Sequence, residues 1–269
     1  METLTGLLKK GPEILVQAGI EEAGLDARLL LEYITGKSRA YYLAHGEECV
    51  TKETADRYLE LVTGRSQHIP LQHLTHQAFF MGYEFYVNED VLIPRQDTET
   101  LVEEALRLLK GRQKPRVLDM CTGSGCILTS ILLEVPDASG TGADLSEKAL
   151  KVAACNARRL QTADRAEFVK SDLFSSEYFS GLVYDVLISN PPYIPTEEIE
   201  GLMEEVRLHD PRMALDGKAD GLYFYRAITK QAMDYMLPGG WLLYEIGWDQ
   251  GKAVKELLDK EGFINTEIK

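Results

Sequence analysis

The sequence is short of basic residues, of cysteines and of long hydrophobic runs. Its 29 Lys and Arg face 43 Asp and Glu, for a formal net charge of −14. This argues against a protein that wraps a phosphate backbone, because nucleic-acid affinity comes largely from Lys and Arg. No run approaches the roughly 18 apolar residues of a membrane span, and Met1-Glu2-Thr3-Leu4 lacks the basic and then apolar layout of a signal peptide. The 4 cysteines form no Cys-x-x-Cys pair, so we expect buried thiols in a reducing cytoplasm.

Residues 1–73 carry apolar side chains at helical spacing and show no catalytic pattern. We expect one helix to end before a break at Gly24, a second to run over residues 27–36, and a third to end before Gly64. The histidines within residues 68–76 are expected to be polar surface, and no metal site is predicted. A small helical domain of this kind either holds a substrate or partner, or serves as scaffold.

Residues 74–93 change character and predict a β-hairpin that links two domains. Two apolar and aromatic runs, 78–81 and 83–87, are joined at Met81-Gly82, where we place the turn. A helix is expected next over residues 97–110.

The front of that helix offers polar side chains whose role the sequence leaves open. Asp97 is placed to cap the helix N-terminus. Thr98 and Glu99 follow it, and they either complete the cap or face a site.

Strand-like and helix-like segments alternate through residues 94–269, which we expect to form one domain. The predicted strands are 116–119, 140–144, 167–169, 183–189, 241–246 and 263–268, and the predicted helices are 124–134, 146–159, 220–237 and 252–260, with a turn at 238–240. This alternation is typical of a parallel sheet covered by helices on both faces.

The stretch Asn190-Pro191-Pro192-Tyr193 follows a buried strand, where open parallel sheets bind their ligands. Proline fixes its own φ and restricts the preceding residue, so this turn is rigid. It offers two acceptors, the Asn190 side-chain oxygen and the Pro191 carbonyl, which suit a target –NH2 group. The Tyr193 ring could cover a planar target.

A glycine-rich loop, Asp119-Met120-Cys121-Thr122-Gly123-Ser124-Gly125, joins the first strand to its helix, as in nucleotide-binding folds. Asp144 ends the next strand, placed for ribose hydroxyls, and Asp172 follows the third, placed for adenine. A nicotinamide dinucleotide site would use the same layout but would want glycine where Leu128 stands. Asp119 would repel a pyrophosphate and could receive a cation, so S-adenosylmethionine (SAM), which has no phosphate, suits the pocket better.

Motifs along nearly the whole chain resemble one known family. They are Ala18-Gly19, Asp26-Ala27-Arg28-Leu29-Leu30-Leu31, Pro70-Leu71-Gln72, Val91-Leu92-Ile93-Pro94-Arg95-Gln96-Asp97-Thr98-Glu99, Thr122-Gly123-Ser124-Gly125, Asp144-Leu145-Ser146, Ser171-Asp172-Leu173-Phe174, Asn190-Pro191-Pro192-Tyr193, Asp210-Pro211-Arg212-Met213-Ala214-Leu215, Asp220-Gly221-Leu222 and Glu245-Ile246-Gly247. On these the chain is similar to the HemK-like protein-(glutamine-N5) methyltransferases, which modify peptide-chain release factors.

The resemblance implies a class I SAM-dependent methyltransferase domain, Rossmann-like with a mostly parallel twisted sheet, after a helical docking domain and a β-hairpin linker. It implies methylation of the glutamine in the Gly-Gly-Gln motif of class I release factors, which modulates translation termination. Separately from the resemblance, we expect a monomer. The catalytic residues would be Asn190, Pro191, Pro192 and Tyr193. The SAM-binding residues would be Asp119, Cys121, Thr122, Gly123, Ser124, Gly125, Asp144, Leu145, Asp172, Leu173 and Asn190.

The chain departs from this family at two places. Cys121 stands where the family often has glycine, so the loop is expected to sit slightly differently there. Lys269 follows directly after the predicted strand 263–268, where the family usually adds one more, antiparallel strand. The chain is therefore either truncated or one strand short.

The Asn-Pro-Pro-Tyr motif is shared with adenine-N6 nucleic-acid methyltransferases, which form the alternative interpretation. Residues 195–206 contain five glutamates and no Lys or Arg, a poor surface for phosphates beside the catalytic turn. A non-catalytic SAM-binding or partner-binding module is a further alternative, which the intact Asn190 turn disfavours.

Overall fold

The computed structural model describes residues 2–269, which divide into two compact units. The helical unit runs to His76 and includes Glu204–His209. The sheet unit comprises Gln77–Met203 and Asp210–Lys269. Among residues 2–269, no helix is both long and apolar enough to cross a membrane.

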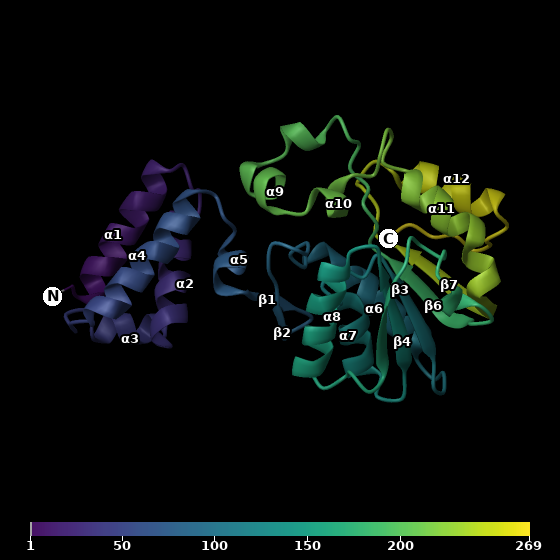
Figure 1. The fold of residues 1–269 in the computed structure, drawn as a ribbon, viewed down its shortest axis with the longest axis horizontal. Helices are drawn as coiled ribbons and strands as arrows, with labels where there is room; N and C mark the ends of the chain where they lie inside the picture. The colour runs from purple at the N-terminus through teal and green to yellow at the C-terminus, as the bar shows by residue number, and fades with distance from the viewer. Residues whose placement is uncertain (1) are drawn as a thin grey trace. The chain divides into compact units, whose positions relative to one another are not determined.

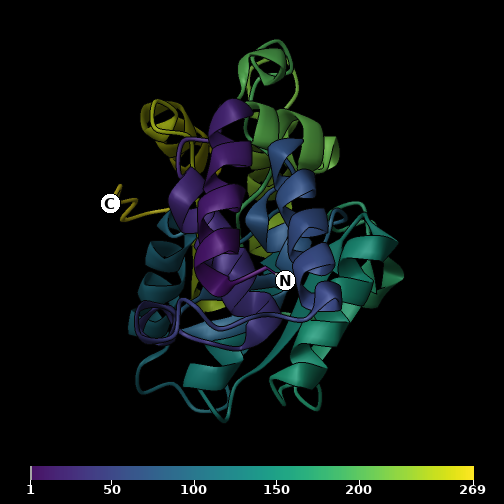
Figure 2. The same ribbon diagram turned by 90° about the vertical axis from the view of Figure 1, so that its left-hand side faces the viewer.

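The helical unit is a small bundle around one apolar core. Its helices are α1 (Leu4–Gln17), α2 (Ala23–Thr35), α3 (Arg39–Ala44), α4 (Lys52–Ser66), α5 (Leu71–Thr75) and α9 (Glu204–His209). Helices α1, α2 and α4 pack pairwise, and α1 and α4 lie side by side in Figures 1 and 2. Tyr58 of α4 is fully buried and donates its hydroxyl to the Leu7 carbonyl at 3.3 Å. A Cβ on Gly11 would come within 1.9 Å of that hydroxyl, so glycine permits the α1–α4 approach.

Glycine positions separate the correct helix-end predictions from the wrong ones. Gly36 follows α2 with φ 64°, the left-handed C-cap that was predicted. The break at Gly24 and the end before Gly64 are wrong, since both lie inside helices. Gly19, with φ 77°, follows α1 instead. At Gly64 a Cβ would lie 2.8 Å from Leu74, so this glycine serves packing rather than termination.

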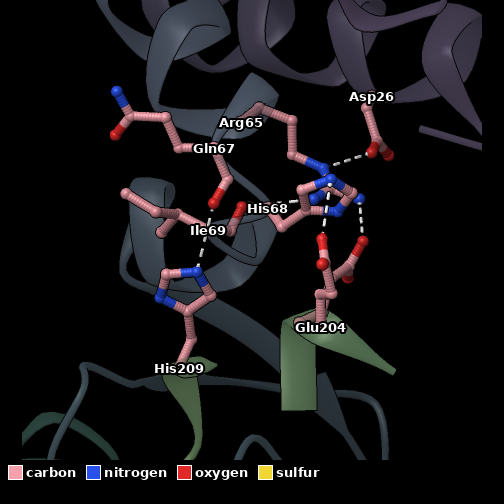
Figure 3. A network of polar contacts seen from close by, with 8 residues as sticks. Asp26, Arg65, Gln67, His68, Ile69, Glu204 and His209 are labelled. Atoms are coloured by element: carbon pink, nitrogen blue, oxygen red, sulfur yellow. Dashed lines mark hydrogen bonds and ion pairs between the residues drawn. The ribbon is translucent and has the colours of Figure 1, made fainter. Parts of the chain in front are cut away.

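A network of charged side chains joins α9 to the rest of the helical unit (Figure 3). The buried Arg65 donates Nε to Asp26 Oδ2 at 2.6 Å and Nη2 to Glu205 Oε1. We call Asp26, Arg65 and Glu205 the Arg65 network. Beside it, His68 pairs with Glu204 at 3.2 Å. The helix α9 thus belongs to this unit, although its neighbours in sequence belong to the sheet unit.

The sheet unit is built on five parallel strands in the order β5-β4-β3-β6-β7. They are β3 (Arg116–Met120), β4 (Ser139–Asp144), β5 (Ala166–Lys170), β6 (Tyr184–Ser189) and β7 (Met236–Tyr244). The chain builds outward from β3 to β5 and then returns to place β6 on the other side. The switch point between β3 and β6 is where such sheets bind ligands.

Helices cover both faces of this sheet, as the sequence predicted (Figure 1). Val117, Val186 and Ile188 pack against α6 (Asp97–Leu109) and α7 (Cys126–Glu134). Leu118 and Leu187, which alternate with them, pack on the opposite face against α11 (Tyr223–Ala232). The other helices are α8 (Glu147–Arg159), α10 (Arg212–Leu215) and α12 (Gly251–Lys260). The predicted hairpin is present as β1 (Gln77–Phe80) and β2 (Tyr83–Tyr86), paired antiparallel around Met81-Gly82.

The predicted last strand over residues 263–268 is wrong. Asn265 takes φ 58° and interrupts any extended run. The backbone of this segment bonds to α12 rather than to β7: Lys255 Nζ of α12 donates to the Thr266 carbonyl at 3.0 Å. Ile264 and Ile268 remain exposed.

Two helix boundaries and one turn also differ from prediction. The helix expected over 220–237 is α11, which begins only after Gly221 takes φ 71°. The turn at 238–240 lies within β7, where the register with β6 shifts. Asp97 does not cap α6: the cap position is Gln96, and Asp97 is already helical.

Candidate active site

A cavity of about 300 Å³ lies in the sheet unit at the carboxyl ends of the strands. It collects most of the predicted site residues: Cys121, Thr122, Gly123, Ser124, Asp144, Leu145, Asp172, Leu173, Asn190 and Pro192. Four predicted residues, Asp119, Gly125, Pro191 and Tyr193, do not line it. The ends of four strands therefore converge on one cavity, as the sequence pattern indicated.

The glycine-rich loop turns through three left-handed residues: Cys121 at φ 63°, Gly123 at 54° and Gly125 at 75°. A Cβ on Gly123 would meet nothing within 4 Å, whereas one on Gly125 would lie 2.8 Å from Ala153 of α8. Gly123 therefore leaves open space for a ligand to approach the backbone, and Gly125 lets α7 and α8 pack closely. Burial raises the pKa of the Cys121 thiol, so it stays neutral.

Asp144 holds this loop as well as facing the cavity. Its Oδ2 accepts from the Gly123 N–H at 2.9 Å, and its Oδ1 accepts from the Ser146 N–H at 2.8 Å. Burial raises the pKa of Asp144, and those two backbone bonds oppose the shift. Each oxygen retains capacity for another donor, which a ribose hydroxyl would supply.

Asp119 lies beneath the loop rather than in the cavity. It is fully buried, and its Oδ2 accepts the Thr122 hydroxyl at 2.5 Å. Burial raises the pKa of Asp119 to about 7, with the Thr122 bond acting against it. Its negative charge is therefore weaker at neutral pH than the sequence suggested, and its visible role is to hold Thr122.

The Asn-Pro-Pro-Tyr turn is held in place from several sides. Ser189 Oγ donates to the Met120 carbonyl at 2.6 Å, which ties the end of β6 to β3. Gln250 Nε2 donates to the Tyr193 carbonyl at 2.9 Å. Tyr193 directs its ring into an apolar cluster with the buried Tyr225, so its side chain supports the turn from behind.

Two glycines permit this packing. A Cβ on Gly217 would lie 2.7 Å from the Tyr193 backbone, and one on Gly221 would lie 2.3 Å from the Tyr193 carbonyl. Gly221 belongs to the motif Asp220-Gly221-Leu222, for which the sequence predicted no role. It lets the following segment lie against the Asn-Pro-Pro-Tyr turn.

Thr98 and Glu245 contact the Asn-Pro-Pro-Tyr turn, and the sequence did not assign a role to either. Asn190 Nδ2 donates to Thr98 Oγ1 at 3.3 Å, so Thr98 faces the site, whereas Glu99 accepts from the Met81 N–H in the hairpin. Glu245, just after β7, accepts the Tyr193 hydroxyl at 3.4 Å. Both stood within resemblance motifs, which was the available signal.

The walls of the cavity carry two cations, and a carboxylate neutralises each. Arg95 Nη2 contacts Asp210 Oδ2 at 2.7 Å, and Lys148 Nζ contacts Asp90 Oδ1 at 2.9 Å. Apolar side chains, including Met213 and Phe224, complete the wall. Within the described part of the chain the cavity therefore offers no unpaired cation to a phosphate, which disfavours a dinucleotide.

Two family descriptions match this sequence, "PrmC N-terminal domain" over residues 6–75 and "Methyltransferase small domain" over residues 97–217. Among curated proteins, release factor glutamine methyltransferases are similar over nearly the whole chain. That of Clostridium acetobutylicum is 35% identical and is covered over 92% of its length by 97% of this chain. That of Bradyrhizobium diazoefficiens is 41% identical, with 84% and 93% covered. That of Bacillus subtilis is 38% identical, with 93% and 100% covered.

Among solved structures, the hMettl16 catalytic domain in complex with MAT2A 3'UTR hairpin 1 is similar in fold. The TM-score is 0.52 at 16% identity, over 86% of this chain and 83% of that one. At this identity the likeness concerns the fold alone.

Proposed function

The chain belongs to the release factor glutamine methyltransferases, and from this premise we propose that Asn190 and the Pro191 carbonyl hold the target amide. The fold is that of class I SAM-dependent methyltransferases, the methyl donor is SAM, and the reaction is methylation of a release factor glutamine. The observation that carries the proposal is the convergence of Asn190, Asp144 and the loop at Gly123 on one cavity. Within the release factor, the specific target that we propose is the glutamine of the Gly-Gly-Gln motif of class I release factors, which is methylated at N5.

The residues of the cavity fit SAM. The unused acceptor capacity of Asp144 suits ribose hydroxyls, the space over Gly123 admits a close ligand, and Asp172 is exposed at the third strand end, where adenine is expected. Cys121, Thr122, Ser124, Leu145 and Leu173 complete the proposed site, with Asp119 and Gly125 shaping the loop from outside the cavity. When bound, SAM supplies a methyl group carried on a cationic sulfur. Arg95 and Lys148 in the cavity wall are each paired with a carboxylate, so they repel this positive sulfur only weakly.

The chemical task of the Asn190 turn is to orient a poor nucleophile. An amide nitrogen shares its lone pair with the carbonyl. If the Asn190 oxygen and the Pro191 carbonyl accept both N–H bonds, that nitrogen is fixed with one direction left open toward the cavity. Positioning of this kind supplies roughly 7–11 kcal/mol of a barrier. No strong base is needed first, because the proton leaves after the nitrogen has been alkylated. Pro192 and Tyr193 keep the turn rigid.

The proposal also assigns a role to each of the three segments of the chain. Residues 1–73 dock the release factor, residues 74–93 link the domains, and residues 94–269 carry the reaction. We assign the enzyme to the cytoplasm as a monomer, in keeping with its unpaired cysteines and acidic composition. The family membership favours glutamine over adenine-N6 as the target, and the acidic stretch at 195–206 supports this choice.

Methyl transfer from labelled SAM to a purified release factor tests the proposal. The matched control is the same release factor with the motif glutamine changed to alanine. We expect label on the first and none on the second. Equal labelling of both would refute glutamine as the target, and label on DNA or RNA alone would favour the adenine alternative.

A further inference from the structure

We propose that Glu245 and Thr98 are positioning residues that set which way round the Asn190 amide lies, so that its oxygen faces the target. We call Glu245, Thr98 and Asn190 the Glu245 relay. The inference rests on the proposed role of Asn190 and adds two residues to it.

The sheet places these groups together. Ser189 and Tyr244 are register partners in β6 and β7, so the residues that follow them, Asn190 and Glu245, leave neighbouring strand ends. The Glu245 N–H donates to the Ser189 carbonyl at 3.1 Å. Thr98, only 3% exposed in the first turn of α6, accepts from Asn190 Nδ2 at 3.3 Å. Tyr193 donates its hydroxyl to Glu245 Oε1 at 3.4 Å, and Thr98 and Asn190 also face this carboxylate with groups that lower its pKa.

The chemistry of the carboxylate gives the relay its direction. An ionised carboxylate only accepts hydrogen bonds, so the Thr98 and Tyr193 hydroxyls must donate to it. The oxygen of Thr98 is then left with lone pairs, which accept from the NH2 of Asn190. The Asn190 oxygen must therefore point the other way, where an acceptor is needed. A flipped amide would present its NH2 group to the target –NH2, donor against donor.

Glu245 acts through Asn190 and not on the substrate. Asn190 and Thr98 line the cavity, whereas Glu245 does not. Its Oε2 is buried and lacks a well-formed hydrogen bond among residues 2–269. A buried acceptor of this kind is costly to keep. Because an ionised carboxylate cannot donate, the Thr98 hydroxyl that faces it must be the donor, and this fixes the direction of that hydroxyl.

The relay depends on an ionised Glu245, which gives a pH signature. Burial raises the pKa of Glu245, while its bonds with Thr98, Tyr193 and Asn190 oppose the shift. The charged and titratable groups around it are Asp97 of α6, Arg95, Tyr193, and Tyr225 of α11, whose hydroxyl donates to the Glu245 carbonyl. The pKa of Tyr193 is raised to about 12, so its hydroxyl remains a donor. Protonation of Glu245 would add a donor and release the constraint.

The test measures kcat and KM for the release factor, together with SAM affinity by calorimetry, for four variants. We expect Glu245→Gln and Thr98→Val to lower kcat about 10- to 100-fold, the range for one lost positioned hydrogen bond, with SAM affinity unchanged. Thr98→Ser restores the hydroxyl and should recover most of the rate. Thr229→Val is the matched control, because Thr229 is equally buried, bonds the hydroxyl of a tyrosine, Tyr244, at 3.0 Å, and does not line the cavity. It should keep the wild-type kcat.

The kcat of the wild type should fall as pH drops through the raised pKa of Glu245, and Glu245→Gln should lack this limb. A wild-type kcat in Glu245→Gln, or an equal loss in Thr98→Ser and Thr98→Val, would overturn the relay. If Glu245→Gln fails to fold, the Thr98 pair decides alone. Failure of the wild type to label the release factor would instead refute the proposed function, so the two failures are distinguishable.

Discussion

The Arg65 network and the Glu245 relay are two buried polar clusters that compensate their buried charge in different ways. Arg65 meets two carboxylates, Asp26 and Glu205. Burial acts to lower the pKa of Arg65, but the two acids prevail and raise it, so the charge is kept. The groups that hydrogen-bond with Glu245 are neutral, and burial raises its pKa. The buried charge of Arg65 is matched by opposite charges and joins helices. The buried acceptor Glu245 is surrounded by donors and orients those donors toward the target amide.

The largest expected effect is on the site that the relay serves. Asn190→Ala should lower kcat by about 100- to 1,000-fold, as loss of one preorganised group at a reacting centre does. SAM affinity should stay within about threefold, because Asp144 and the loop at Gly123 remain. Single-turnover methylation and calorimetry measure the two quantities. Near wild-type methylation would remove Asn190 from the catalytic set.

The next effect concerns stability in the helical unit. Arg65→Ala should lower the free energy of unfolding by about 3–5 kcal/mol, because it leaves Asp26 buried without its partner. The control is Arg28→Ala, which removes an i,i+4 pair with Glu32 that is only partly buried. That variant should lose about 0.5 kcal/mol or less. Urea unfolding compares them, and equal losses would end the contrast between a structural charge network and an ordinary ion pair.

Asp119 of the glycine-rich loop, a buried acid outside both clusters, should give its own pH signature in the stability of the protein. Its pKa in the folded protein is raised to about 7, so between its unfolded pKa and that value the folded state binds more protons. Stability should therefore fall as pH rises from 4 to 7, by at most about 1.4 kcal/mol per pH unit from this group.

Asp119→Asn keeps an acceptor for Thr122 and removes the titration. Its stability should depend less on pH across that window, as measured by unfolding in buffers from pH 4 to 7. A dependence as steep as that of the wild type would show that other groups cause it.

The smallest effect belongs to Cys121, at φ 63° in the glycine-rich loop. Cys121→Gly should change stability by no more than about 1 kcal/mol, since glycine takes this conformation without strain but gains freedom when unfolded. Cys121→Val should destabilise more, because a β-branched residue is poorly tolerated there. Thermal melts rank the two, and valine equal to glycine would show that the loop is not left-handed at this position.

Much of the site could be predicted because each of its residues comes at the end of, or directly after, a strand that the sequence pattern predicts. The loop at 121–125, Asp144, Asp172 and Asn190 each follow a strand, and parallel strands bring their carboxyl ends to one edge. Thr98 and Glu245 could not be assigned, because 92 and 55 positions separate them from Asn190. Only strand order and the docking of α6 bring them to it. Asp119 was predicted to face the ligand, yet local pattern cannot tell the front of a loop from its underside.

The sequence by itself determined the alternation of strands and helices, the hairpin at Met81-Gly82 and the rigid turn at Asn190. Each follows from short-range chemistry: side-chain periodicity, glycine freedom and proline geometry. Tertiary structure alone decided that the segment 263–268 is not a strand and that α9 joins the helical unit. It also placed a buried carboxylate behind Asn190. Those outcomes depend on partners distant in the chain, whose contacts no local pattern encodes.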